Sequence, residues 1–285
     1  MKVMMIGAHP DDVELRAAGF ARKLLKAGHE VRFLVLCNGC KGHHILTTEE
    51  TRQVRAIEAA NVCKHLGLTG YDIWSDMDDC RLEVTMENRC RLIRDIRAFA
   101  PDLVISHRPN DYHADHRAAG QLVQDASYML IVPHDVPESP AMRKMPVITY
   151  FEDHFTSPTP FRADVLVDIS QEMDEKINSM MYSPSQFFEW LPYSEGEAHL
   201  VPEDNEGRIQ FLRRGITPNL TDEEALAAPH NYYALRSAKT AARFRRELID
   251  RYGEAGKKIR FAEAFEICEY GSQPSPSELK EFFLL

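Results

Sequence analysis

The first 130 residues alternate short apolar runs with longer amphipathic stretches, and this alternation restricts the fold more than any other feature of the chain. The apolar runs predict β-strands at 2–7, 29–36, 71–74 and 103–106. The amphipathic stretches predict helices at 13–27, 48–66, 84–99 and 116–129. Strands separated by helices of this length form a mostly parallel sheet with helices on both faces. We therefore predict a Rossmann-like α/β fold.

The second half of the chain is less regular. It predicts strands at 147–151 and 164–169 and helices at 172–182, 205–214 and 236–251. Prolines at 274 and 276, among serines, predict a loose C-terminal tail. We expect residues 1–170 to form a Rossmann-like catalytic core. Residues 171–285 are expected to form a mainly helical region. We expect it to pack on the same domain, as a less regular α+β extension of the core.

Charge and composition exclude several classes of protein. The chain has 285 residues, with 34 Lys and Arg against 44 Asp and Glu, so its net charge of −10 argues against nucleic-acid binding. No stretch reaches the roughly 20 apolar residues that span a membrane, and the apolar run at the N-terminus is too short for a signal peptide. We expect a cytoplasmic protein whose six cysteines stay reduced. Cys37 and Cys40 form a single C-x-x-C pair, which is only a weak metal or redox signal.

The turn after the first predicted strand carries His9, Asp11 and Asp12 around a proline. Adjacent carboxylates beside a histidine are costly unless a cation compensates them. The alternative is a solvated Asp pair that caps the following helix. Taken alone, the segment does not decide between these two interpretations.

A second polar segment follows the fourth predicted strand. It holds His107, Asp111, His113, Asp115 and His116 within ten residues. In open parallel sheets, ligands bind beyond the carboxyl ends of the strands, so both segments should lie on one rim of the sheet. Three histidines and two aspartates beside His9 and Asp12 favour a metal site.

A catalytic zinc ion takes about three protein ligands and keeps one position open. His9, Asp12 and His116 are the natural three ligands. Asp11 remains as a general base for the attacking water. His113 is placed to stabilise the oxyanion or to protonate the leaving amine, with Asp115 fixing its tautomer.

These segments read Ala8-His9-Pro10-Asp11-Asp12-Val13-Glu14 and His113-Ala114-Asp115-His116. The chain thereby resembles the PIG-L, or LmbE-like, family of zinc-dependent N-deacetylases, most firmly up to about residue 130. The resemblance implies the same zinc ligands and the same roles for Asp11, His113 and Asp115. Arg55 and Glu58 resemble the Arg-x-x-Glu of the family, and we interpret Glu14 and Glu58 as structural. Ala18-Gly19 replaces a frequent Gly-Gly, and Ala114 replaces a proline; neither change affects a ligand.

Four residues are candidates for substrate binding. They are Arg55, Arg108, Tyr112 and His43. Among weaker candidates, His154 is more readily structural than pocket-lining. An aromatic run is more readily core or interface than a sugar-stacking wall; it comprises Phe187, Phe188, Trp190 and Tyr193.

The leading hypothesis is a metal-dependent amidohydrolase that removes an acyl group, most simply acetyl, from an amino sugar, its conjugate or a similar small molecule. The expected cofactor is Zn²⁺, with another divalent transition metal as the alternative. A second hypothesis keeps the hydrolase but assigns it a non-acetyl amide. A third, a non-catalytic metal- or sugar-binding protein, is disfavoured because a binding site needs neither Asp11 as base nor His113 as acid. The resemblance is also compatible with a homo-oligomer.

Overall fold

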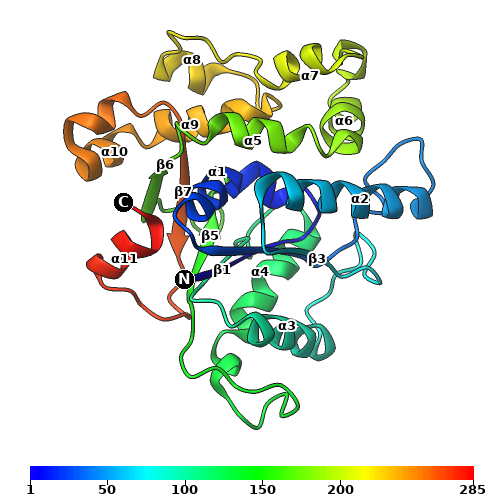
Figure 1. Ribbon diagram of the computed structural model, residues 1–285, viewed down its shortest axis with the longest axis vertical. Coiled ribbons are helices and arrows are strands. Elements are labelled where there is room, and N and C mark those ends of the chain that lie inside the picture. Colours follow the sequence, from blue (N-terminus) through cyan, green and yellow to red (C-terminus); the bar gives the residue numbers. More distant parts are fainter.

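The computed structural model describes all residues from 1 to 285 and is built on one seven-stranded sheet (Figure 1). The strands lie in the order β3-β2-β1-β4-β5-β7-β6. Their bounds are β1 Lys2–Gly7, β2 Glu30–Val35, β3 Gly70–Ile73, β4 Leu103–Ser106, β5 Val147–Phe151, β6 Val165–Asp168 and β7 Ala262–Ile267. The mixed α/β architecture confirms the predicted fold class.

The first five strands are parallel, as the alternation of strands and helices predicts. β7 is the exception, because it runs antiparallel to both β5 and β6. The sequence reading did not predict this strand. It inserts a segment from the far end of the chain between two earlier strands, so the C-terminal region takes part in the same sheet as residues 1–170.

Four helices cover the two faces of the parallel part of the sheet: α1 Asp12–Lys26, α2 Thr48–Leu66, α3 Met86–Phe99 and α4 Ala114–Ala126. α1 and α2 lie on one face, and α3 and α4 lie on the other (Figure 1). Two apolar cores result. Val3 and Met5 of β1 face the first, while Met4 and Ile6 face the second. A strand buried on both faces is apolar along its whole length, which explains the uninterrupted apolar run at 2–7.

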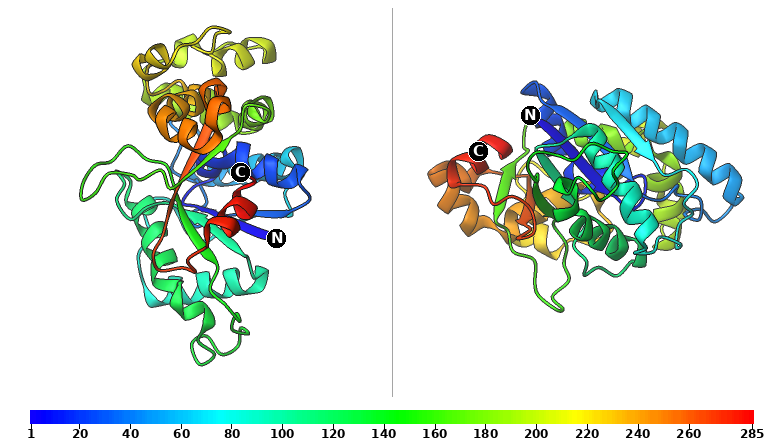
Figure 2. Two further views of the ribbon diagram at one scale, coloured as in Figure 1. Left: turned by 90° about the vertical axis from the view of Figure 1, so that its left-hand side faces the viewer. Right: turned by 90° about the horizontal axis from the view of Figure 1, so that it is seen from below.

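Further helices pack as an outer layer over α1 and α2, as Figure 1 shows. They are α5 Met173–Met180, the π-helix η2 Ser185–Trp190, α6 Leu191–Ser194, α7 Asn205–Leu212, α8 Asp222–Ala227, α9 Arg236–Arg243 and α10 Arg245–Tyr252. The helix expected at 236–251 is therefore two helices, which meet at Phe244. In the left view of Figure 2, this layer lies apart from α3 and α4, with the sheet between them.

The C-terminal residues form helix α11, Pro276–Phe283, where a loose tail was expected. Ser275 caps this helix in a reciprocal capping box with Glu278, and a proline is favourable in the first turn. The Phe283 side chain is fully buried, and its ring stacks on Phe20 with 5.2 Å between centroids. The prediction failed because prolines and serines that indicate loops also begin helices.

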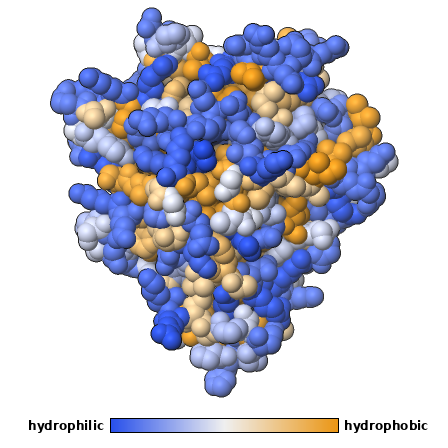
Figure 3. All heavy atoms as spheres, in the orientation of Figure 1, coloured by the Kyte–Doolittle hydropathy of each residue, from blue (hydrophilic) through white to orange (hydrophobic).

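The face drawn in Figure 3 is mainly hydrophilic, with hydrophobic residues gathered in a band across its middle. None of the helices combines the length and the apolar character needed to cross a bilayer. All six cysteines are free thiols.

Candidate functional site

The two polar segments meet at the point where the strand order reverses. β1 pairs with β2 on one side and with β4 on the other, so the loops that follow β1 and β4 leave the sheet next to each other. Such a reversal opens a crevice at the carboxyl ends of the strands. His9 follows β1, and the segment from His107 to His116 follows β4, as predicted.

His9 is held by a carboxylate on one side and faces a second carboxylate on the other. Its Nε2 lies 2.9 Å from Asp115 Oδ2, and its Nδ1 lies 3.6 Å from Asp12 Oδ2. A carboxylate on the far nitrogen fixes the ring and its tautomer and leaves the near nitrogen as a metal ligand.

His116 also lies between an orienting carboxylate and Asp12, but its two ring nitrogens have the opposite roles from those of His9. Its Nδ1 lies 3.0 Å from Asp111 Oδ1, and its Nε2 lies 3.2 Å from Asp12 Oδ1. Burial opposes ionisation of Asp111, but the hydrogen bond to His116 outweighs it and lowers the Asp111 pKa to about 2. Asp111 is thus an anion that orients His116, a function the sequence reading did not assign to it.

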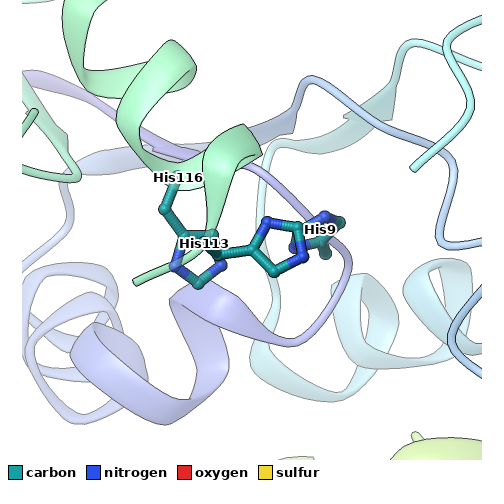
Figure 4. Close-up of side chains that lie close together, drawn as sticks. All are labelled: His9, His113 and His116. Atoms are coloured by element: carbon teal, nitrogen blue, oxygen red, sulfur yellow. The ribbon is translucent and has the colours of Figure 1, made fainter. Parts of the chain in front are cut away.

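The structure fits a divalent cation between these side chains. Zinc ligands at about 2.0–2.2 Å in a tetrahedron are spaced by about 3.3–3.6 Å, and the Asp12 oxygens lie 3.2 and 3.6 Å from the two histidine nitrogens. His9, His113 and His116 form one group with metal-ligand spacing (Figure 4). His107 belongs to a second such group with Asp12 and His116. However, His107 Nε2 lies 3.1 Å from the Ala8 amide, which donates to it, and is thereby occupied.

Asp11 stands beside this cluster with a mostly free carboxylate. Its backbone has φ 127°, a conformation that costs energy for a residue with a side chain and that recurs at functional sites. Burial raises the pKa of Asp11 to about 6, against the opposing effect of Arg55. Its one ion-pair partner is that guanidinium, with Arg55 Nη2 3.3 Å from Asp11 Oδ2. A carboxylate with a pKa near neutrality suits a general base.

Arg55 lies beside Asp11 at the wall of the crevice, and its side chain is only 1% exposed. Its Nη1 lies 3.4 Å from Glu58 Oε2, and Glu58 in turn accepts hydrogen bonds from Ser185 in η2. Arg55 therefore positions Asp11, and because it also lines the cavity, the predicted substrate contact stays a prediction. Gly39 makes room for it: its φ is +77°, and a Cβ there would lie 2.8 Å from Arg55 Nε.

His113 is the N-cap of α4 and faces the crevice. Its Nδ1 accepts the Asp115 amide at 3.1 Å, so the proton of the neutral ring is on Nε2. Burial and the neighbouring histidines lower the His113 pKa, which favours that neutral form. The Asp115 carboxylate lies 3.8 Å from His113 Nδ1, too far for a hydrogen bond but close enough for an ion pair. Its hydrogen bonds go to His9 and to the amides of Cys80 and Leu82, so its role as the partner of His113 stays a prediction.

Glu14 is fully buried and supports the fold, as we expected. The Tyr71 hydroxyl lies 3.0 and 3.3 Å from its two carboxylate oxygens and donates to them. Burial raises the pKa of Glu14 to about 8. The residue is therefore largely protonated at neutral pH and is not a second anion of the site.

The crevice is a cavity of about 630 Å³. His9, Asp11, Asp12, His113 and His116 line it, and so does Tyr112, whose side chain is largely exposed, as expected of a substrate contact. Several lining residues were not predicted: Arg16 comes from α1, and His230, Tyr233 and Arg236 come from the outer layer. No motif marks these four residues in the sequence.

Two predicted substrate contacts are wrong. Arg108 is buried and binds Asp153 through two hydrogen bonds, at 2.6 and 2.7 Å, with further bonds to the carbonyls of Thr159 and Phe155. His43 Nε2 lies 2.6 Å from Glu189 Oε2, and its Nδ1 accepts two backbone amides, those of Ile45 and Leu46. Because the polar atoms of both side chains are already occupied, neither is free for a ligand.

The weaker candidates divide between core and pocket. Phe187 and Phe188 are buried in the core, as expected. Trp190 lines the cavity, whereas Tyr193 stacks on His44 with 3.8 Å between centroids. His154 lines a smaller pocket of about 40 Å³ next to the cavity.

A family model described as PIG-L, GlcNAc-PI de-N-acetylase, matches residues 4–127, the segment that carries the two polar loops after β1 and β4. Over this segment, which is less than half of the chain, the chain matches the PIG-L family. The sequence resemblance is thus confirmed over the part of the chain on which it rests.

Relatives of the chain have more than one activity. The diacetylchitobiose deacetylase of Thermococcus kodakarensis is 27% identical over 67% of this chain and 74% of that protein. The 4-oxalmesaconate hydratase of Pseudomonas putida is 24% identical over 67% of this chain and 76% of that protein. Among solved structures, the N,N'-diacetylchitobiose deacetylase of Pyrococcus horikoshii superposes with a TM-score of 0.64, at 20% identity over 97% of this chain and 88% of that chain. At that identity, the likeness shows the fold alone.

Proposed function

We propose that the protein is a zinc-dependent hydrolase that removes an N-acetyl group from an amino sugar or a similar small molecule. One observation carries this proposal. His9 and His116 are each held by a carboxylate and turn their free nitrogen toward Asp12, and Asp11 stands beside them with a pKa near neutrality. The relationship to the deacetylase of T. kodakarensis supports the choice of an acetyl amide.

In this proposal, His9, Asp12 and His116 hold the ion. When bound, a zinc ion there supplies Lewis-acid activation of the water and of the amide carbonyl. The second carboxylates, Asp115 and Asp111, keep both histidines in the tautomer that leaves the required nitrogen unprotonated.

The protein's own groups account for the proton transfers. Asp11 accepts a proton as the water oxygen bonds to the acyl carbon. The Nε2–H of His113 donates a hydrogen bond to the carbonyl oxygen as negative charge develops on it. The C–N bond then breaks, and the proton held by Asp11 passes to the leaving amine. The products are acetate and a free amine.

The hydratase of P. putida supplies a second candidate function. Adding water across a carbon–carbon double bond also needs a base for the water and a proton donor, and Asp11 and His113 supply such a pair. Hydrolysis of a non-acetyl amide is a variant of the first proposal, because Asp11 and His113 would act on that amide bond in the same way.

A screen of the zinc-reconstituted protein separates these functions. N-acetylglucosamine and N,N'-diacetylchitobiose are assayed for acetate, amides with longer acyl chains for free amine, and 4-oxalmesaconate for loss of its conjugated absorbance. The proposal predicts acetate release that is abolished by a chelator and restored by Zn²⁺. Hydration of 4-oxalmesaconate without acetate from either sugar would replace it with the second candidate.

A further inference from the structure

Two arginines share the cavity with the proposed reaction centre. Arg16 lies one helical turn after Asp12 on α1, and Arg236 begins α9 in the outer layer. Both line the 630 Å³ cavity and also the adjoining 40 Å³ pocket. The two guanidinium groups therefore bring positive charge to the part of the cavity that adjoins the small pocket.

Arg16 lacks a close carboxylate partner. Its Nη1 donates to the carbonyl of Glu152 at 2.8 Å, a neutral acceptor. Its nearest carboxylate oxygen is Asp111 Oδ2, 3.8 Å from Nη2, and Asp111 is already hydrogen-bonded to His116. The guanidinium is thus oriented by the backbone, and the only carboxylate within ion-pair distance is shared with His116.

Arg236 has no partner at all. Its side chain makes no hydrogen bond and no ion pair, and its Nε is completely covered. Burial lowers the pKa of Arg236, and the positive charge of Arg16 lowers it further. A half-buried guanidinium without an acceptor is costly, so a site that keeps one is expected to receive an anion.

The nearby carboxylates are occupied by other groups. Glu152 accepts hydrogen bonds from Thr240 and from Arg243. Glu263 pairs with Lys176 at 2.7 Å and accepts two backbone amides of α1. In the cavity itself, Glu195 pairs with His230 at 3.1 Å.

A neighbouring histidine experiences the same positive field. Burial, and then the charges of Arg236, Arg243 and Arg16, lower the pKa of His154 to about 4. The field therefore extends beyond the two guanidinium groups and opposes any further positive charge.

We propose that Arg16 and Arg236 form an anion subsite, so that the substrate carries a carboxylate or phosphate group in addition to the bond that reacts. The guanidinium fork matches both of these planar or tetrahedral anions, and the cavity joins the subsite to Asp11 and His113. The two arginines then determine substrate specificity without taking part in the proton transfers. The identity of the cleaved bond in this inference rests on the proposed function. The binding of the anion does not depend on it.

Three ligands of similar size test the subsite. N-acetylglucosamine is neutral, N-acetylmuramic acid adds a carboxylate, and N-acetylglucosamine 6-phosphate adds a phosphate ester. Binding is measured by calorimetry in the zinc-loaded Asp11→Asn protein, where turnover is blocked, and acetate release is measured in the wild type. We expect at least one anionic ligand to bind roughly tenfold or more tightly than the neutral one, and the identity of that ligand separates carboxylate from phosphate.

Arg236→Gln and Arg16→Gln, each made in the same Asp11→Asn background, should remove this preference while the affinity for the neutral sugar changes less than about threefold. Arg213→Gln is the matched control, because Arg213 loses the same charge but pairs with Asp174 away from the cavity. Equal binding of all three ligands, or a preference that survives in both variants, would overturn the subsite. Anion binding that depends on Arg236, but with no acetate released from any ligand, would leave the subsite intact and reject the proposed function.

Discussion

Asp115 Oδ2 lies 2.9 Å from His9 Nε2, although the two residues are 106 positions apart. The same carboxylate accepts the amides of Cys80 and Leu82, so two separate loops meet on one side chain of α4. Asp115 is therefore a support for the proposed metal ligand more than a partner of His113. The site depends on residues behind the ligands as much as on the ligands themselves.

Replacing Asp115 by Asn should weaken zinc binding by roughly 10–100-fold, because the carboxylate that orients His9 and raises its basicity is lost. Zinc affinity is measured by competition with a chromogenic chelator. Asp125→Asn is the control, since Asp125 is on the same helix and contacts Gln121 instead. Unchanged affinity in a folded Asp115→Asn protein would contradict the assigned role.

Removing Arg55 should destabilise the protein as well as the reaction. Arg55→Ala leaves Asp11 and Glu58 as buried carboxylates without their cation. Loss of one partner of a buried ion pair costs about 3–5 kcal/mol of unfolding free energy, measured here by urea denaturation. A loss below about 1 kcal/mol would show that Arg55 does not hold this network together.

Gly39 and Gly28 separate backbone strain from crowding. Both have positive φ, but a Cβ on Gly28 meets nothing within 4 Å, whereas one on Gly39 meets Arg55. Gly28→Ala should cost about 1 kcal/mol and leave the reaction rate unchanged. Gly39→Ala should cost more and also slow acetate release, because Arg55 can no longer hold Asp11. Equal behaviour of the two variants would mean that the contact with Arg55 has no catalytic consequence.

The sequence predicted the inner part of the fold and the central residues of the site for a physical reason. His9 and Asp12 closely follow β1, His116 lies in the first turn of the helix after β4, and the hydrophobic pattern locates strands well. Their side chains converge because parallel strands deliver their following loops to one rim. Predicting this convergence requires only the order of strands and helices along the chain.

Contacts between distant segments could not be predicted in this way. Arg108 and His43 looked available for a ligand, but each is bound by a residue far along the chain, Asp153 and Glu189 respectively. Arg236 was missed for the same reason, since it reaches the cavity only because the outer layer folds over α1. β7 was missed because its six residues do not alternate strictly between polar and apolar and lie between two helical regions.

The C-terminal helix offers a test of how far the fold depends on its last residues. Phe283→Ala removes a ring that is buried against Phe20 and Phe265 and should cost about 3–5 kcal/mol of unfolding free energy. The adjacent Phe282 is only partly buried, so Phe282→Ala should cost clearly less. Thermal or urea unfolding measures both variants, and equal losses would argue against the docking of α11.

The most direct test of the proposed reaction combines acetate release with metal content in Asp11→Asn. The account assigns Asp11 to proton transfer and assigns metal binding to His9, Asp12 and His116. It predicts that the variant retains one zinc ion per chain while acetate release from N,N'-diacetylchitobiose falls by at least roughly a hundredfold. Loss of the metal, or acetate release close to that of the wild type, would contradict this division of roles.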